Sequence, residues 1–332
     1  MPELRRDPLS GRWVIIAPER ALRPSEILPG DLPHQHGPCP FCPGHERLTP
    51  PELLARRPAG APPNGPGWVV RAFPNRYPAL RVEEAGDREA EGFYDRMGGV
   101  GAHEVVVDTP THGEALGEGD ASQVAVLIAA LRDRIRDLRL DQRLRAVLPF
   151  KNQGAAAGAT LEHSHCQLLA LPLVPGNTLI ELGHAAAYHR DKERCLFCDM
   201  LRAEQRHGPR FIAENGEMLA LAPFASRVPF ETWILPRRHG SAFEDLDESQ
   251  VDSLADLLRT VLRKLAQALD RPAYNLVIHT APLREAPLPY YHWYVELLPV
   301  LTRPGGFEWG SGSYINPTPP EEAAAFLRKV TA

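Results

Sequence analysis

The sequence lacks the features that would place it in a membrane or on nucleic acid. No uninterrupted apolar run reaches the roughly 18 residues that a membrane span requires. The N-terminal stretch MPELRRDPLSGRWVIIAPER lacks the basic start and apolar core of a signal peptide. Positive charge is not in excess either, because 37 Lys and Arg face 42 Asp and Glu, for a net charge of −5. We therefore expect a cytoplasmic protein without nucleic-acid or membrane partners, in which bound phosphate must be met by local positive charge.

Cysteine is scarce, and its spacing is informative. Four of the five cysteines form two C-x-x-C pairs, Cys39 with Cys42 and Cys195 with Cys198. In a chain expected to be cytoplasmic, such pairs favour metal or redox chemistry over structural disulfides. The fifth, Cys166, is most simply a small buried hydrophobic residue.

The same order of motifs occurs twice along the chain, which indicates an internal duplication. The words CPFC and CLFC at the cysteine pairs are followed by VVVDTPTH, ending at His112, and TWILPRRH, ending at His239. After each histidine, residues 120–138 and 247–265 carry apolar side chains at helical spacing, with an aspartate at the start as a possible cap. We predict two domains, residues 1–178 and 179–332, separated where LPLVPGNT breaks the pattern.

A strand-like segment in each half completes the repeat. In the first half it reads EHSHCQLLALP, with His163, His165 and Gln167 at alternate positions, so the three side chains share one face of a strand. In the second half it reads YHWYVELLP, in which His292 is kept but tyrosine and glutamate replace the other two. The first histidine therefore has the pattern of a structural residue, whereas His165 is special to the first half.

Each half thus supplies two cysteines and two histidines in the same order. A Cys2His2 set is a standard composition for tetrahedral structural zinc, and four protein ligands leave no open position for a catalytic water. The predicted ligands are Cys39, Cys42, His112 and His163 in the first half, and Cys195, Cys198, His239 and His292 in the second. His45 is a rival ligand for the first site, but the second half has no matching histidine. Both sites are predicted to hold structural zinc, with iron as an alternative at the second.

His165, two residues beyond a predicted metal ligand, is a candidate nucleophile. A neutral imidazole fixed in one tautomer can attack phosphorus and carry a nucleotide covalently. The alternative is that His165 is a further ligand or a hydrogen-bonded core residue. The loop at 150–160, FKNQGAAAGAT, is rich in small residues that let backbone N–H groups approach phosphate oxygens. Arg20 and Arg23 have a spacing suited to clamping a diphosphate.

Together these motifs give the chain a resemblance to a known family. It resembles the galactose-1-phosphate uridylyltransferases, a branch of the histidine-triad superfamily, nearly from end to end. The likeness rests on DPLSGRWVIIAPERALRPSE, CPFCPGHE, DTPTH, KNQGAAAGATLEHSHCQ and GGFEWGSGSYINPTPPEEAAAFLR. It implies an α+β fold of two tandem histidine-triad-like domains, with mostly antiparallel sheets and packed helices, commonly assembled as a homodimer.

The resemblance also implies a ping-pong reaction and roles for particular residues. His165 would attack the α-phosphorus of a nucleoside-diphosphate sugar, and the nucleotidyl-histidine would then pass its nucleotide to a sugar 1-phosphate. Gln167 would hydrogen-bond the transferring phosphoryl group, which a glutamine can do without competing for a proton. The other expected substrate-binding residues are Arg20, Arg23, Asn152, Gly158 and Thr160 at the phosphates, and Asn75 in FPNRYPAL as a candidate wall of the base pocket.

Two departures from the bacterial pattern leave the acceptor open. The bacterial enzymes have H-P-H where this chain has Ser164 between its histidines, and Ile315 stands where they have a glutamine that contacts the hexose phosphate. The H-S-H, KNQGA and YINP words are closer to the plant-type relatives that act as ADP-glucose phosphorylases, with inorganic phosphate as the acceptor. We predict a UDP-glucose–hexose-1-phosphate uridylyltransferase first, an ADP-glucose phosphorylase second, and a non-covalent nucleotide binder or hydrolase third.

Overall fold

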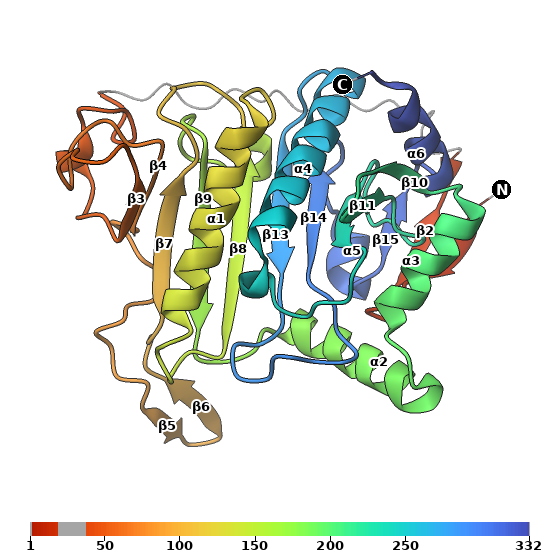
Figure 1. Cartoon of the computed structure of the whole chain (residues 1–332). Coiled ribbons are helices and arrows are strands. Elements are labelled where there is room, and N and C mark those ends of the chain that lie inside the picture. The colour runs from red at the N-terminus through yellow and green to blue at the C-terminus, as the bar shows by residue number, and fades with distance from the viewer. Residues whose placement is uncertain (1, 19–37, 332) are drawn as a thin grey trace.

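The computed structural model describes residues 2–18 and 38–331 and is organised around one large antiparallel sheet (Figure 1). Helices α1 (Ala121–Leu138) and α4 (Glu248–Ala268) lie side by side across one face of it. In order across the sheet, its described strands are β10 (Phe211–Glu214), β11 (Met218–Leu221), β12 (Thr232–Pro236), β14 (Tyr294–Pro299), β13 (Tyr274–His279), β8 (Ala146–Gln153), β9 (His165–Leu171), β7 (Ala102–Val107), β4 (Val70–Pro74) and β3 (Leu54–Arg56). The predicted α+β class, with antiparallel strands and packed helices, is confirmed.

The strand order reflects the internal repeat. From the centre outwards, the first half runs β8, β9, β7, β4, β3, and the second half runs β13, β14, β12, β11, β10. The halves join where β8 pairs with β13, with Phe150 opposite Val277, so one sheet crosses from one half to the other. The domain boundary after residue 178 stays a prediction. It falls within the first turn of α2 (Gly176–Lys192).

The two long helices form where the apolar spacing predicts them. The segments 120–138 and 247–265 correspond to α1 and α4, whose apolar faces pack on the sheet and form the main core. Asp247 caps α4, because its side chain accepts from the Gln250 N–H at 2.9 Å while the Gln250 side chain accepts from the Asp247 N–H at 3.3 Å. Asp120 lies at the start of α1 without such a bond.

Alternation along the strands decides which side chains face away from this core. Cys166 and Leu168 of β9 lie in the core beneath the helices, as do Val295 and Leu297 of β14. Their strand neighbours therefore point to the opposite face of the sheet. That face carries His165 and Gln167 in the first half and Tyr294 and Glu296 in the second.

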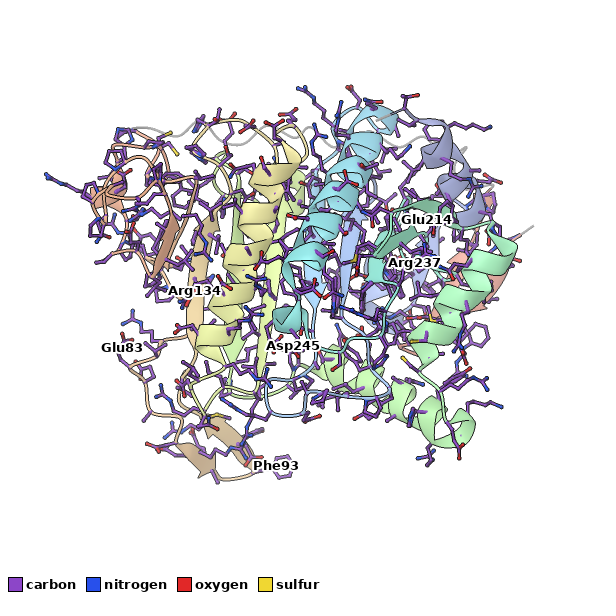
Figure 2. The ribbon with its side chains drawn as sticks, in the orientation of Figure 1. Glu83, Phe93, Arg134, Glu214, Arg237 and Asp245 are labelled. Carbon is purple, nitrogen blue, oxygen red and sulfur yellow. The ribbon has the colours of Figure 1, made fainter. Side chains whose placement is uncertain are left out.

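Smaller elements complete the fold. The first and last strands, β1 (Glu3–Arg6), β2 (Trp13–Ile16) and β15 (Tyr314–Asn316), form a separate three-stranded sheet. The other helices are α3 (Leu196–His207), α5 (Gly306–Ser311) and α6 (Pro320–Lys329). The hairpin of β5 (Arg88–Glu91) and β6 (Tyr94–Met97) projects from the body, with Phe93 95% exposed at its end (Figure 2). Within the described ranges, no helix is long and apolar enough to cross a membrane.

Candidate active site and metal centres

The strand β9 begins at His165, whose imidazole is held in one tautomer. The ring is buried, and its Nδ1–H donates to the His163 carbonyl at 2.8 Å, which leaves the free lone pair on Nε2. Burial, helped by the Lys151 ammonium, lowers the pKa of His165 below its ordinary value, so the ring is neutral at neutral pH. Phe41 packs edge-on against it, with ring centroids 5.2 Å apart. A neutral imidazole with one defined lone pair is what nucleophilic attack on phosphorus requires.

Gln167, two residues on, is oriented by a histidine for which the sequence gives no signal. The Gln167 Oε1 accepts from the Nε2–H of His103 at 2.8 Å, and the Ala79 N–H donates to the Nδ1 of His103 at 3.1 Å. The Asn75 Nδ2 lies 3.2 Å from the His103 Nε2, which brings this predicted base-pocket residue beside Gln167. With its oxygen engaged, Gln167 offers its NH2 group as a donor. Only the register of β7 against β9 places His103 here.

The small-residue loop after β8 is shaped by glycine and held by the second half of the chain. Gly154 and Gly158 have φ values of +83° and +89°, in the left-handed region that other residues rarely adopt. The Asn152 Oδ1 accepts from the Nδ2 of Asn275 on β13 at 2.8 Å, and the same Nδ2 donates to the Ala157 carbonyl at 2.9 Å. One side chain of the second half therefore fixes both ends of this loop.

Of the other predicted substrate-binding residues, the structure describes some and leaves two arginines outside the described ranges. Asn152 lies two residues beyond Phe150, which pairs with Gln167, so its side chain is on the same face of the sheet. Thr160 is exposed at the end of the loop. Arg20 and Arg23 lie outside the described residues, and their contact with phosphate stays a prediction.

The first predicted metal site is brought together by the fold. The Sγ of Cys42 lies 3.5 Å from the His112 Nδ1 and 3.6 Å from the His163 Nδ1, and the Cys39 Sγ lies 3.7 Å from the His163 Nδ1. All four potential ligand atoms are within 4.8 Å of one another. The His163 Nε2–H donates to the Thr109 carbonyl at 2.8 Å, so its Nδ1 lone pair is the one aimed at the sulfurs. This donor set fits a closed tetrahedral zinc site.

The rival ligand of the first site is engaged elsewhere. The Nδ1–H of His45 donates to the Cys39 carbonyl at 2.8 Å, which closes the cysteine loop on itself. Its hydrogen bond explains a histidine at this position without a metal.

In the second predicted site, three of the four predicted ligands come together as they do in the first. The ligand atoms of Cys195, Cys198 and His239 lie within 4.8 Å of one another, and His292 is beside them. The rings of His239 and His292 are 5.2 Å apart at 90°, close to the 5.3 Å and 83° of the pair in the first site. The buried His292 Nε2 has no hydrogen-bond partner among the described residues. In the first site the matching nitrogen of His163 donates to a carbonyl, and neither nitrogen of His292 joins the 4.8 Å group, so His292 as the fourth ligand stays a prediction.

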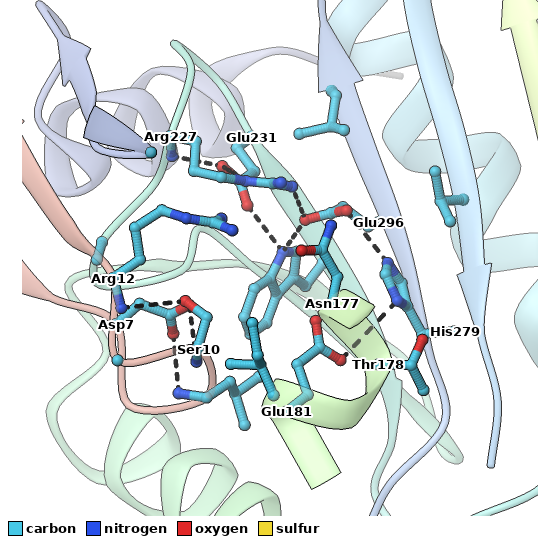
Figure 3. A pocket seen from close by; sticks show the side chains of 18 of the residues that line it. Asp7, Ser10, Arg12, Asn177, Thr178, Glu181, Arg227, Glu231, His279 and Glu296 are labelled. Carbon is cyan, nitrogen blue, oxygen red and sulfur yellow. Dashed lines mark hydrogen bonds and ion pairs between the residues drawn. The ribbon is translucent and has the colours of Figure 1, made fainter. Parts of the chain in front are cut away.

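The second half has a pocket at the place that corresponds to the catalytic face (Figure 3). Glu296 pairs with Trp233 of β12 as Gln167 pairs with Val105 of β7. The cavity measures about 630 Å³. Tyr294, at the position of the nucleophile, bonds through its hydroxyl to a carboxylate of α2 at 3.2 Å, and burial raises its pKa well above the ordinary value. This half therefore offers a protonated phenol where the first half offers a free imidazole nitrogen.

The floor of this pocket is a network of charged side chains that point toward one another (Figure 3). Glu296 accepts from the Arg227 guanidinium, and from the His279 Nε2–H at 3.2 Å. Burial raises the pKa of Glu296, but Arg227 and the His279 bond outweigh burial and hold that pKa well below its usual range. Burial raises the pKa of the neighbouring Glu231 to about 8, although Arg227 opposes the shift. One carboxylate is therefore ionised against the arginine while the other holds a proton.

We expect Arg227→Met to lower the free energy of unfolding by roughly 3 kcal/mol, because it leaves the buried Glu296 without its main countercharge. Arg237→Met is the matched control, since its partner Glu214 and Arg237 itself are 44% and 39% exposed (Figure 2). An exposed pair contributes about 1 kcal/mol or less. Denaturant unfolding of both variants measures the difference. Equal losses of unfolding free energy would contradict a stabilising role for the buried Arg227–Glu296 pair.

The sequence is also similar to a known protein family and to individual known enzymes. Residues 1–175 match a family model described as galactose-1-phosphate uridyl transferase, N-terminal domain. The ADP-glucose phosphorylase of Arabidopsis thaliana is 38% identical over 338 aligned positions, spanning 99% of this chain and 93% of the relative. The galactose-1-phosphate uridylyltransferase of Thermotoga maritima is 30% identical over 338 positions, spanning 99% and 98%.

Solved structures share the whole fold. The crystal structure of an ADP-glucose phosphorylase from Arabidopsis thaliana with bound ADP-glucose has a TM-score of 0.86 and 35% identity, with 100% of both chains covered. A structure described as a uridylyltransferase has a TM-score of 0.78 and 29% identity, with 99% of this chain and 97% of the other covered.

Proposed function

Because this chain belongs to the galactose-1-phosphate uridylyltransferase family and is a nucleotidyltransferase, we propose that it moves a nucleoside monophosphate through a covalent intermediate on His165. The observation that carries the proposal is the state of that side chain. His165 is buried and neutral, and its Nδ1–H is bound to a carbonyl, so Nε2 is a fixed and unprotonated nucleophile.

The reaction then has two displacements. In the first, the Nε2 lone pair attacks the α-phosphorus of a nucleoside-diphosphate sugar, and the phosphorus–oxygen bond to the sugar phosphate breaks, which releases the sugar 1-phosphate. In the second, an acceptor phosphate oxygen attacks the same phosphorus, and the electron pair of the nitrogen–phosphorus bond returns to Nε2. The Gln167 NH2 group, held by His103, is placed to donate to a non-bridging oxygen as charge develops there.

The two metal centres would be structural in this scheme. A zinc ion bound by four protein ligands supplies cross-linking of the chain and has no position for substrate. In the first half, the residues that would hold it include His163, whose carbonyl fixes the His165 tautomer, and Cys39 and Cys42, which flank the Phe41 ring packed on His165.

We place inorganic phosphate first as the acceptor and ADP-glucose first as the donor. Two observations support this order, which reverses the ranking from sequence alone. Identity to the phosphorylase, 38%, exceeds the 30% to the uridylyltransferase. Ile315 stands on β15, opposite Ile15 of β2, and its aliphatic side chain cannot donate a hydrogen bond to a hexose phosphate. The uridylyltransferase reaction is the second candidate, supported by the family match itself.

A product assay tests the proposal. The protein is incubated with ADP-glucose or UDP-glucose, each with phosphate or galactose 1-phosphate, and products are separated by anion-exchange chromatography. We expect ADP and glucose 1-phosphate from ADP-glucose and phosphate. UDP-galactose from UDP-glucose and galactose 1-phosphate would favour the second candidate. Release of free nucleoside monophosphate, independent of either acceptor, would contradict transfer and favour a hydrolase.

A further inference from the structure

Directly beneath the nucleophile, on the helix side of the sheet, lies a polar cluster that neither the metal sites nor the proposed chemistry uses. It consists of Lys151 of β8, Asp108 just after β7, and Ser164 between the two histidines. Their side chains are 0, 1 and 3% exposed, in that order. A lysine and an aspartate this deeply buried are rare in proteins, so their presence needs an explanation.

The three side chains form a hydrogen-bonded triangle on the Oδ2 oxygen of Asp108, while its buried Oδ1 has no partner among the described residues. The Lys151 Nζ donates to the Asp108 Oδ2 at 2.5 Å, to the Ser164 Oγ at 2.7 Å and to the His165 carbonyl at 3.1 Å. The Ser164 hydroxyl donates to the same Asp108 oxygen at 2.8 Å, and the Asp108 N–H donates to the Ser164 carbonyl at 3.2 Å. All three donors of the ammonium group are used, and one of them holds the backbone of the nucleophile itself.

Stability alone is a poor explanation for this network. Removing two charges from water is expensive, and well-packed apolar residues of similar volume are often at least as stabilising as a buried ion pair. The network instead connects strands β7, β8 and β9 at the residue where β9 begins. It holds the Ser164 side chain and the His165 carbonyl from below, while the Thr109 carbonyl, next to Asp108, holds His163.

We propose that Lys151 is a positioning residue for His165, acting with Asp108 and Ser164 to fix the backbone from which the nucleophile projects. The inference rests on the proposed function of His165. A nucleophile misplaced by about 1 Å loses on the order of 100-fold in rate. A rigid backbone at His165 therefore affects the rate of nucleotidyl transfer more than it affects the stability of the fold.

The test separates positioning from stability by removing the whole ion pair. Lys151→Met alone leaves Asp108 charged and buried, so it destabilises the fold whatever its role. The double variant Lys151→Met with Asp108→Leu leaves no buried charge. We expect it to fold, to bind ADP-glucose with wild-type affinity, and to form the nucleotidyl-enzyme about 100-fold more slowly at saturating donor in a rapid-quench experiment.

The matched control is another buried ion pair on β7. Arg134 of α1 bonds both oxygens of Glu104 at 2.7 Å, and this pair has no hydrogen bond to the His163–Gln167 segment. The double variant Arg134→Met with Glu104→Leu should change the thermal midpoint but leave the nucleotidylation rate within about twofold. Ser164→Ala, which keeps the lysine–aspartate pair, should slow the same step by about tenfold, since it removes the two hydrogen bonds of the Ser164 hydroxyl, to Lys151 and to Asp108.

The outcomes are distinct. Wild-type nucleotidylation rates in the Lys151–Asp108 double variant would overturn the inference, because the network would then only stabilise the fold. If that double variant does not fold, Ser164→Ala decides, and a wild-type rate there would overturn the inference. No adduct on the wild-type protein from either ADP-glucose or UDP-glucose would instead overturn the proposed function, and this inference with it.

Discussion

Replacement of His165 by alanine is expected to lower turnover by roughly 10⁴-fold or more, with little change in thermal stability. The variant removes the imidazole whose Nε2 lone pair is free to attack at the described face of the sheet. His163 cannot substitute, because its Nε2–H is bound to Thr109 and its Nδ1 faces the two cysteines. Steady-state release of glucose 1-phosphate from ADP-glucose and phosphate measures the loss.

The control for this variant is a histidine away from the site. His189, in the last turn of α2, lies against Tyr290 with ring centroids 6.1 Å apart. His189→Ala should retain turnover within about twofold. Turnover of His165→Ala at the level of the wild type would leave no role for a covalent intermediate at this residue.

Loss of the first metal site should abolish the chemistry as well as reduce stability. Cys39→Ser with Cys42→Ser removes both sulfurs, and structural zinc contributes several kcal/mol to folding. We expect the thermal midpoint to fall by about 10 °C or more and nucleotidylation to be lost even below the new midpoint. The reason is that this site holds His163 and the Phe41 loop, both of which contact His165.

The second site supplies the matched comparison. Cys195→Ser with Cys198→Ser should lower the thermal midpoint by a similar amount but leave nucleotidylation measurable below it, since this cluster lies in the half without the nucleophile. Metal analysis by mass spectrometry should find two ions per chain in the wild type and one in each double variant. Equal loss of chemistry in both variants would contradict the division of roles between the halves.

Much of the site could be predicted from the sequence because its information is local. Alternation along β9 is enough to put His165 and Gln167 on one face, and the repeat pairs the first cysteine motif with its histidines. His163, predicted on the same strand, lies in a bend just before it. The helices α1 and α4 follow from apolar spacing in the same way. The homodimer and the contacts of Arg20 and Arg23 stay predictions.

The remaining parts depend on contacts between segments far apart in the chain. Lys151, Asp108 and Ser164 are brought together by the register of three strands, and no local pattern marks a lysine for burial. Asn275 reaches the phosphate loop only because β13 of the second half pairs with β8 of the first. His103 meets Gln167 through the pairing of β7 with β9. These contacts depend on strand order and register, which the local sequence patterns do not determine.

Transfer through His165 is tested by looking for the covalent intermediate on that residue. The protein is mixed briefly with ADP-glucose in the absence of phosphate, denatured, and analysed by mass spectrometry of the intact chain and of its peptides. We expect one adenylyl group per chain, carried by His165, discharged by added phosphate and absent from His165→Ala. An adduct on another residue, or substrate turnover with no adduct on the enzyme, would contradict transfer through His165.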